Sequence, residues 1–88
     1  MKNQIIKLVI PKQKWSSPIN PDKRQKYEEP YLVRTWLAFD GLKTDWQIEK
    51  RLDTDKPFIL AKTCTGQRYG SFDRLSSAKL AAYLLDLG

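Results

Sequence analysis

Apolar residues along the last third of the chain alternate with turn signals in an order that predicts a strand, a tight turn, a second strand and a helix. Residues 58–63 form a short apolar run ahead of a turn, which is typical of a buried strand. Thr65 and Gly66 follow, and glycine readily takes the positive φ that such a turn uses. A two-residue turn there places Ile59 opposite Phe72, Ala61 opposite Gly70 and Thr63 opposite Arg68. The other face of this hairpin then carries Lys62 beside Tyr69.

The helix that closes the chain is predicted to end at Gly88 and to be capped by Asp73 or Ser76. At 100° per residue, one broad arc of this helix is apolar, and we expect that arc to cover the sheet. The arc comprises Ala78, Leu80, Ala81, Leu84, Leu85 and Leu87, whereas Lys79, Tyr83 and Asp86 fall on the opposite side.

Two earlier stretches are also predicted as strands. Residues 4–10 are rich in β-branched residues and end at Pro11, and residues 31–39 alternate with the period of a strand. We assign Tyr31, Val33, Thr35, Leu37 and Phe39 to the core, and Leu32, Arg34, Trp36 and Ala38 to the outward face. The alternative, in which Trp36 is buried beneath the arm or the helix, stays open because tryptophan is buried in most proteins.

Residues 44–52 fit two patterns. Thr44 and Gln47 could form a helix-capping box, but the alternation that begins at Trp46 suits a strand. The turn signal at residues 40–41 favours the strand, since a hairpin there continues an antiparallel meander. The fold class predicted for the whole chain is therefore α+β, as one domain with a small antiparallel sheet of three to five strands packed against one C-terminal helix.

Composition removes several classes of chemistry. The chain has no histidine and one cysteine, so it cannot build a Ser-His-Asp triad, a histidine metal ligand or an internal disulfide. It has no apolar run long enough to span a membrane, and its first residues are too interrupted for a secretory signal. These features predict a cytoplasmic protein that is not an enzyme and needs no cofactor or metal. Cys64 has no histidine to activate it, and Asp53 and Asp55 lack the glycine and glutamate of a calcium loop.

Positive charge is concentrated in the first third of the chain. The net charge is +6, and residues 1–29 hold seven basic and three acidic residues, against nine and seven in the rest. Four prolines punctuate residues 11–30, which predicts a long basic surface loop or arm able to follow phosphates. Trp15 either pins this arm to the domain or contacts a partner.

One segment resembles a known pair of families. Glycines, an arginine, an aromatic residue and an aspartate come first, at Gly66, Arg68, Gly70, Phe72 and Asp73. An alanine-rich helix follows, with Ala78, Ala81, Ala82 and Tyr83. Residues 66–83 thereby resemble the end of the apetala-type DNA-binding domain and of the arm-binding domain of phage integrases. The resemblance implies a sheet that enters the major groove of DNA, with Arg68 and outward residues of the preceding strand as contacts.

Two functions follow as expectations. The first is nucleic-acid binding, with DNA implied by the resemblance, in which lysines contact phosphates and Trp36, Arg34, Arg68 and Tyr69 contact bases. The expected binding residues are Lys12, Lys14, Lys23, Arg24, Lys26, Arg34, Trp36, Lys62, Arg68 and Tyr69. The alternative is an adaptor or inhibitor that docks on a larger enzyme or nucleoprotein complex, because exposed tryptophan and arginine also mark protein contacts.

Overall fold

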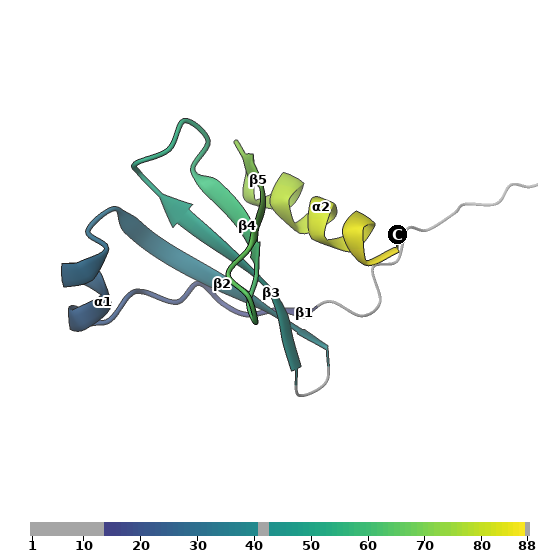
Figure 1. Cartoon of the computed structure of the whole chain (residues 1–88), viewed down its shortest axis with the longest axis horizontal. Helices are drawn as coiled ribbons and strands as arrows, with labels where there is room; N and C mark the ends of the chain where they lie inside the picture. The colour runs from purple at the N-terminus through teal and green to yellow at the C-terminus, as the bar shows by residue number, and fades with distance from the viewer. Residues whose placement is uncertain (1–13, 41–42, 88) are drawn as a thin grey trace, which may run out of the picture.

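A computed structural model describes residues 14–40 and 43–87 and shows a five-stranded sheet with one helix across a face (Figure 1). The elements are β1 (Lys14–Trp15), α1 (Lys23–Glu28), β2 (Leu32–Asp40), β3 (Lys43–Arg51), β4 (Phe58–Lys62), β5 (Arg68–Phe72) and α2 (Leu75–Leu87). Neighbouring strands are antiparallel and follow chain order from β1 to β5. The predicted α+β class is confirmed. The strand predicted at residues 4–10 lies outside the described residues.

The ambiguous residues 44–52 belong to strand β3, which confirms the preferred prediction of a hairpin. β2 and β3 pair with Trp36 opposite Ile48 and Ala38 opposite Trp46. This register shifts between Leu32 and Arg34, so residue 33 is a bulge that no residue of β3 opposes.

The predicted faces of β2 are reversed. Trp36 and Ala38 are buried on the side that α2 covers, whereas Tyr31 and Phe39, assigned to the core, are exposed. The physical reason is the match across strands. Small Ala38 leaves room for the large indole of Trp46, and Trp36 packs beside Ile48. The burial alternative for Trp36 is therefore correct.

The β4–β5 hairpin has the predicted turn glycine and a different register. Gly66 has φ of 72°, and its N–H donates to the Lys62 carbonyl. The Lys62 N–H in turn donates to the Gln67 carbonyl, so the loop is longer than two residues. Phe58 therefore pairs with Phe72 and Leu60 with Gly70, one position away from the prediction.

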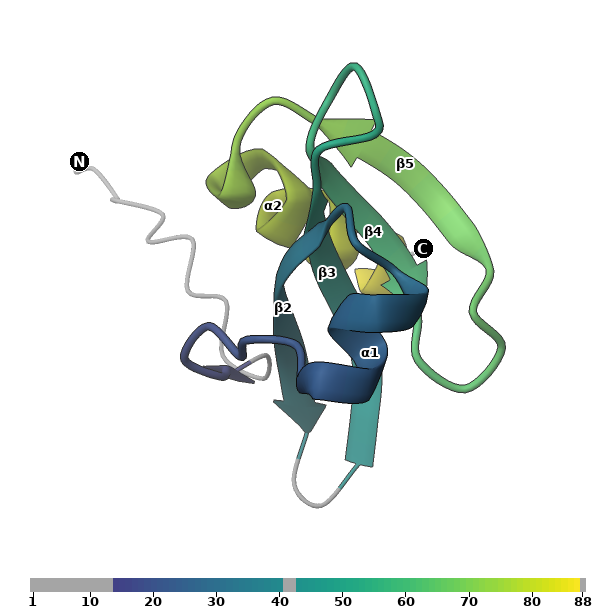
Figure 2. The same cartoon turned by 90° about the vertical axis from the view of Figure 1, so that its left-hand side faces the viewer.

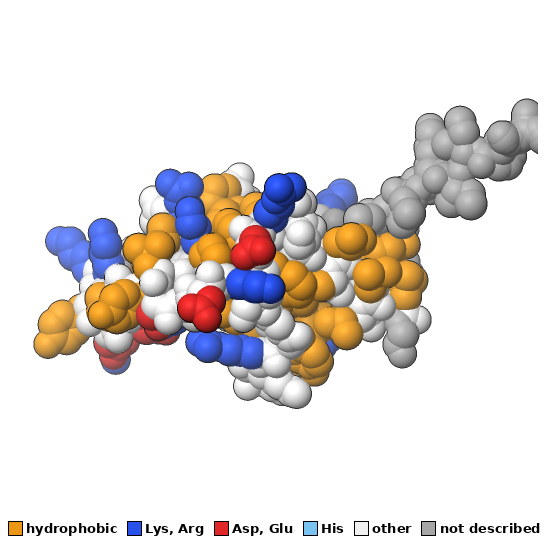
Figure 3. Space-filling view, turned by 90° about the horizontal axis from the view of Figure 1, so that it is seen from above, with side chains coloured by type: hydrophobic (Ala, Val, Ile, Leu, Met, Phe, Trp, Pro, Cys, Tyr) orange, Lys and Arg blue, Asp and Glu red, His pale blue; other side chains and the backbone are white. Residues whose placement is uncertain are grey.

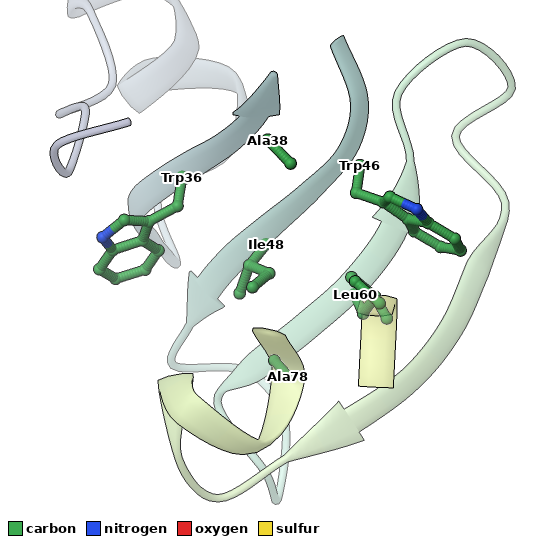
Figure 4. Packing of buried hydrophobic residues seen from close by; sticks show 7 residues of the cluster. Trp36, Ala38, Trp46, Ile48, Leu60 and Ala78 are labelled. Atoms are coloured by element: carbon green, nitrogen blue, oxygen red, sulfur yellow. The ribbon is translucent and has the colours of Figure 1, made fainter. Parts of the chain in front are cut away.

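The core is a small cluster between the sheet and α2 (Figure 4). Its buried members are Trp36, Ala38, Trp46, Ile48, Leu60, Ala78 and Ala82. α2 crosses β3, β4 and β5, and fully buried Ala78 and Ala82 let its backbone lie close to the strands. Trp15 is partly buried against this cluster, which supports its role as an anchor for the preceding segment.

The predicted core arc of α2 is confirmed for Ala78 and Ala81, which pack in or against the core, and is wrong for its leucines. Leu80, Leu84, Leu85 and Leu87 are 45–68% exposed, because the helix is turned so that its alanine side faces the sheet. Two residues predicted on the far side instead reach toward the sheet. The Lys79 ammonium lies 5.9 Å from the centre of the Trp15 ring, and Asp86 Oδ1 accepts a 2.9 Å hydrogen bond from Trp46 Nε1. Neither described helix is long and apolar enough to cross a membrane.

Candidate nucleic-acid interface

α1 carries the most exposed cluster of basic and aromatic side chains. Its first turn is closed by Asp22, whose Oδ1 accepts a 2.7 Å hydrogen bond from the Gln25 N–H. The helix has no buried residue, and Lys23, Arg24 and Lys26 are all exposed. Tyr27, 88% exposed, lies among these cations. Figure 2 shows α1 in front of the strand ends, on the side away from α2.

α1 is tied to the sheet by a buried arginine at the end of β3. Arg51 is 8% exposed and donates a 2.8 Å hydrogen bond to Oε1 of Glu29, the residue directly after α1. It also donates to both carboxylate oxygens of Asp53, at 3.0 and 3.2 Å. A third carboxylate, that of Glu49, lies 3.8 Å from Arg51. Because this network spans α1, β3 and the following loop, it fixes the end of the sheet that presents α1.

The network also determines which charges titrate unusually. The hydrogen bonds that Arg51 donates to Asp53 and Glu29 raise the pKa of Arg51 above its ordinary value, so the guanidinium stays charged. The bond between Arg51 and Asp53 holds the pKa of Asp53 below its ordinary value. Burial raises the pKa of Glu49, because the carboxylate loses hydration that the nearby guanidinium only partly replaces.

Internal contacts therefore engage the acids at this end and leave several cations unpaired. Asp22 caps α1, Glu29 binds Arg51, and Glu28 lies 3.7 Å from Arg24 in a highly exposed pair. Within residues 14–40 and 43–87, neither Lys23 nor Lys26 forms an ion pair. Lys23 and Lys26 are therefore exposed cations that a ligand could contact, beside carboxylates that already have internal partners.

Arg34 and Lys50 form a second pair of cations, on the sheet itself. They are Cα partners across β2 and β3, on the α2 side of the sheet. Neither has an ion-pair partner among the described residues. Lys50 lies 5.8 Å from the Phe58 ring centre, and Arg34 is exposed. Like charges directly opposite each other destabilise a strand pair, so a bound anion would relieve this repulsion.

A shallow hollow of about 330 Å³ lies between α1 and the start of β2. Its lining combines four apolar residues with one amide and one cation: Asn20, Pro21, Lys26, Pro30, Leu32 and Val33. Such a surface offers an apolar wall beside a cation. No three metal-ligating side chains gather in the described part of the chain.

The remaining predicted residues lie elsewhere. Trp36 is 7% exposed and belongs to the core, so the prediction that it stacks on a ligand is wrong. Lys62 and Tyr69 do lie together, because both pack on Trp46. The Lys62 ammonium lies 4.1 Å from the centre of the Trp46 ring, and the ring centres of Tyr69 and Trp46 are 5.2 Å apart. Arg68 lies opposite Ala61, on the face of the sheet away from α2. Lys14 is exposed on the edge strand β1, and Lys12 lies outside the described residues.

Three contributors were not among the predicted site residues. Tyr27 follows Lys26 directly, and this basic-aromatic pairing was a usable signal. Tyr31 is 54% exposed although its alternation suggested the core. Lys50 could be found only from the strand register, because sixteen positions separate it from Arg34 in the sequence.

Comparison with known proteins identifies no relative: no protein-family model, curated protein or solved structure matches the chain. The resemblance of residues 66–83 to apetala-type and integrase domains stays a prediction.

Proposed function

We propose that this chain binds nucleic acid through the basic end of the molecule, defined as Lys23, Arg24, Lys26, Tyr27, Tyr31, Arg34 and Lys50. The observation that supports this proposal most is the separation of charges. Arg51 and the α1 cap engage acids next to these residues, while Lys23, Lys26 and Arg34 have no acidic partner in the described chain.

The expected mode of binding follows from the side chains. Lysine and arginine neutralise phosphates and release counterions, which makes the affinity dependent on salt. Exposed Tyr27 and Tyr31 provide flat rings on which unpaired bases can stack. Since phosphates and stacking carry little sequence information, we expect weak discrimination among sequences.

Charge removal tests the proposal. In Lys23→Gln/Lys26→Gln, the slope of log affinity against log salt should fall by about 1.8 on duplex DNA if each lysine neutralises one phosphate. The matched control is Lys56→Gln/Arg68→Gln, which removes the same charge from exposed positions outside the basic end. Its slope should stay that of the unmodified chain. Equal losses in both variants, measured by fluorescence anisotropy, would reject the basic end as the site.

A second candidate function is binding to a protein. It is favoured by the exposed leucines of α2, which lie apart from the basic end (Figure 3). Exposed apolar patches commonly mark protein contacts.

A further inference from the structure

The cations of the basic end lie on two opposite faces of one sheet. Lys26 lines the hollow between α1 and the start of β2 (Figure 2). Leu32 lines the same hollow and pairs with Arg51, on the face of the sheet away from α2. Arg34 instead pairs with Lys50, on the face against which α2 packs, and neither cation of this pair has an ion-pair partner among the described residues. A ligand that neutralises both groups of cations must therefore pass from one face of the sheet to the other.

The bulge at Val33 joins these two faces. Residues two apart in a regular strand share a face, but the register shift between Leu32 and Arg34 directs their side chains to opposite faces. Val33 itself lines the hollow, and Arg34 is the next residue in the chain. The hollow and the Arg34–Lys50 pair are therefore neighbours at the start of β2, and a flexible chain of phosphates can reach both.

The hollow is suited to an unpaired base. Its volume of about 330 Å³ lies at the small end of the range for ligand pockets. Pro21, Pro30 and Leu32 offer apolar contacts to a flat ring, and Asn20 carries an amide with both a donor and an acceptor, as the edge of a base requires. A base in a duplex is stacked and paired, so it would have to leave the duplex to enter this hollow.

Two exposed tyrosines extend the same surface. Tyr27 and Tyr31 are 88% and 54% exposed, and they directly follow Lys26 and Pro30, which line the hollow. Unpaired bases can stack on such rings. A duplex has its base faces covered, and with a persistence length of about 50 nm it stays straight over the width of this molecule. A duplex bound at α1 therefore cannot bend around the sheet to reach Arg34 and Lys50.

We propose, on the basis of the nucleic-acid binding proposed above, that the preferred ligand is single-stranded DNA or RNA, which runs from α1 over the hollow and the Val33 bulge to the Arg34–Lys50 pair. Phosphates meet the lysines of α1 on one face and Arg34 and Lys50 on the other, and a base lies in the hollow between them. The preference for a single strand then follows from shape, since on charge alone a duplex, with its denser phosphates, would bind more tightly.

Fluorescence anisotropy with matched probes tests this proposal. One probe is a single strand of about 16 nucleotides without self-complementarity, made as DNA and as RNA, and the other is the DNA strand annealed to its complement. At least one single strand should bind about tenfold more tightly than the duplex, because a stacked base contributes a factor of that order. Equal or tighter binding of the duplex would overturn the proposal and leave nucleic-acid binding itself intact, whereas binding of no probe at low salt would remove both.

Removal of bases from the probe separates base contacts from charge. A single strand of the same length whose central positions lack bases keeps every phosphate, and it should bind about tenfold more weakly than the complete strand. Equal affinity would mean that the chain contacts phosphates alone, and it would overturn the seating of a base in the hollow.

Arg34→Gln tests the path across the two faces. The slope of log affinity against log salt should fall by about 0.7 for the single strand, the value for one phosphate, and stay unchanged for a duplex bound at α1. Lys14→Gln is the matched control, because it removes the same charge from an exposed position near the other end of β2, opposite Phe39. Its slopes should stay those of the unmodified chain. An unchanged single-strand slope in Arg34→Gln, or an equal fall for both probes, would overturn this path.

Discussion

Arg51 shows how one buried residue arranges the surface around it. Its guanidinium donates hydrogen bonds to Glu29 and Asp53 and lies near Glu49, so three carboxylates surround one cation. Among the described residues, Lys23 and Lys26 at the same end have no acidic partner, whereas Arg24 lies 3.7 Å from Glu28. The position of Trp36 also depends on its neighbours. Packing across the strands, beside Ile48, buries its indole in the core.

Glu49→Gln should raise the melting temperature at pH 7, and the difference from the unmodified chain should shrink toward pH 4. Burial raises the pKa of Glu49 in the folded chain. The folded state therefore binds this proton more readily than the unfolded state, and the associated stability is lost as pH rises through the folded pKa. Glutamine keeps the shape and carries no charge. Thermal unfolding at both pH values measures the difference; a variant that is less stable at pH 7 would contradict this account.

The two helices differ in what positions them. α2 is held by alanines against the sheet, whereas α1 has no buried residue and is positioned by its Asp22 cap and the Arg51 network. The apolar period of α2 was visible in the sequence, but its orientation was not, because alanines on one side and leucines on the other are both apolar. The two indoles of Trp36 and Trp46 already fill the core, so small residues suit the sheet side.

Ala82→Leu should therefore destabilise the fold by about 1–3 kcal/mol, because Ala82 is fully buried and the core has no room for a larger side chain. Leu84→Ala should change the free energy of unfolding by no more than about 0.5 kcal/mol, since Leu84 is more than half exposed. Urea unfolding of each variant and of the unmodified chain measures both changes in the free energy of unfolding. A larger loss of unfolding free energy in Leu84→Ala would mean that Leu84 packs in the core, and it would contradict this orientation of α2.

For the molecule as a whole, the sequence was sufficient for the α+β class, the meander of β2 to β5 and the glycine turn at Gly66. The sequence did not predict the β4–β5 register. Thr65 and Gly66 suggested a two-residue turn, but the loop is longer, and the register depends on its length. The sequence also missed the Arg34–Lys50 pair, which exists only once β2 and β3 are aligned. The lysines of α1 were identifiable from charge alone, whereas only the structure shows that Lys23 and Lys26 have no ion-pair partner among the described residues.

The most direct test of the central claim is a nuclear magnetic resonance titration of the chain with a short DNA oligonucleotide. Backbone amide shifts should change most from Lys23 to Tyr31 and at Arg34 and Lys50, and these changes should reverse when salt is added. Lys56 and the outward face of α2 should be unaffected by DNA at a constant protein concentration. Shifts confined to the Arg68 face of the sheet, or no shifts at low salt, would contradict binding at the basic end.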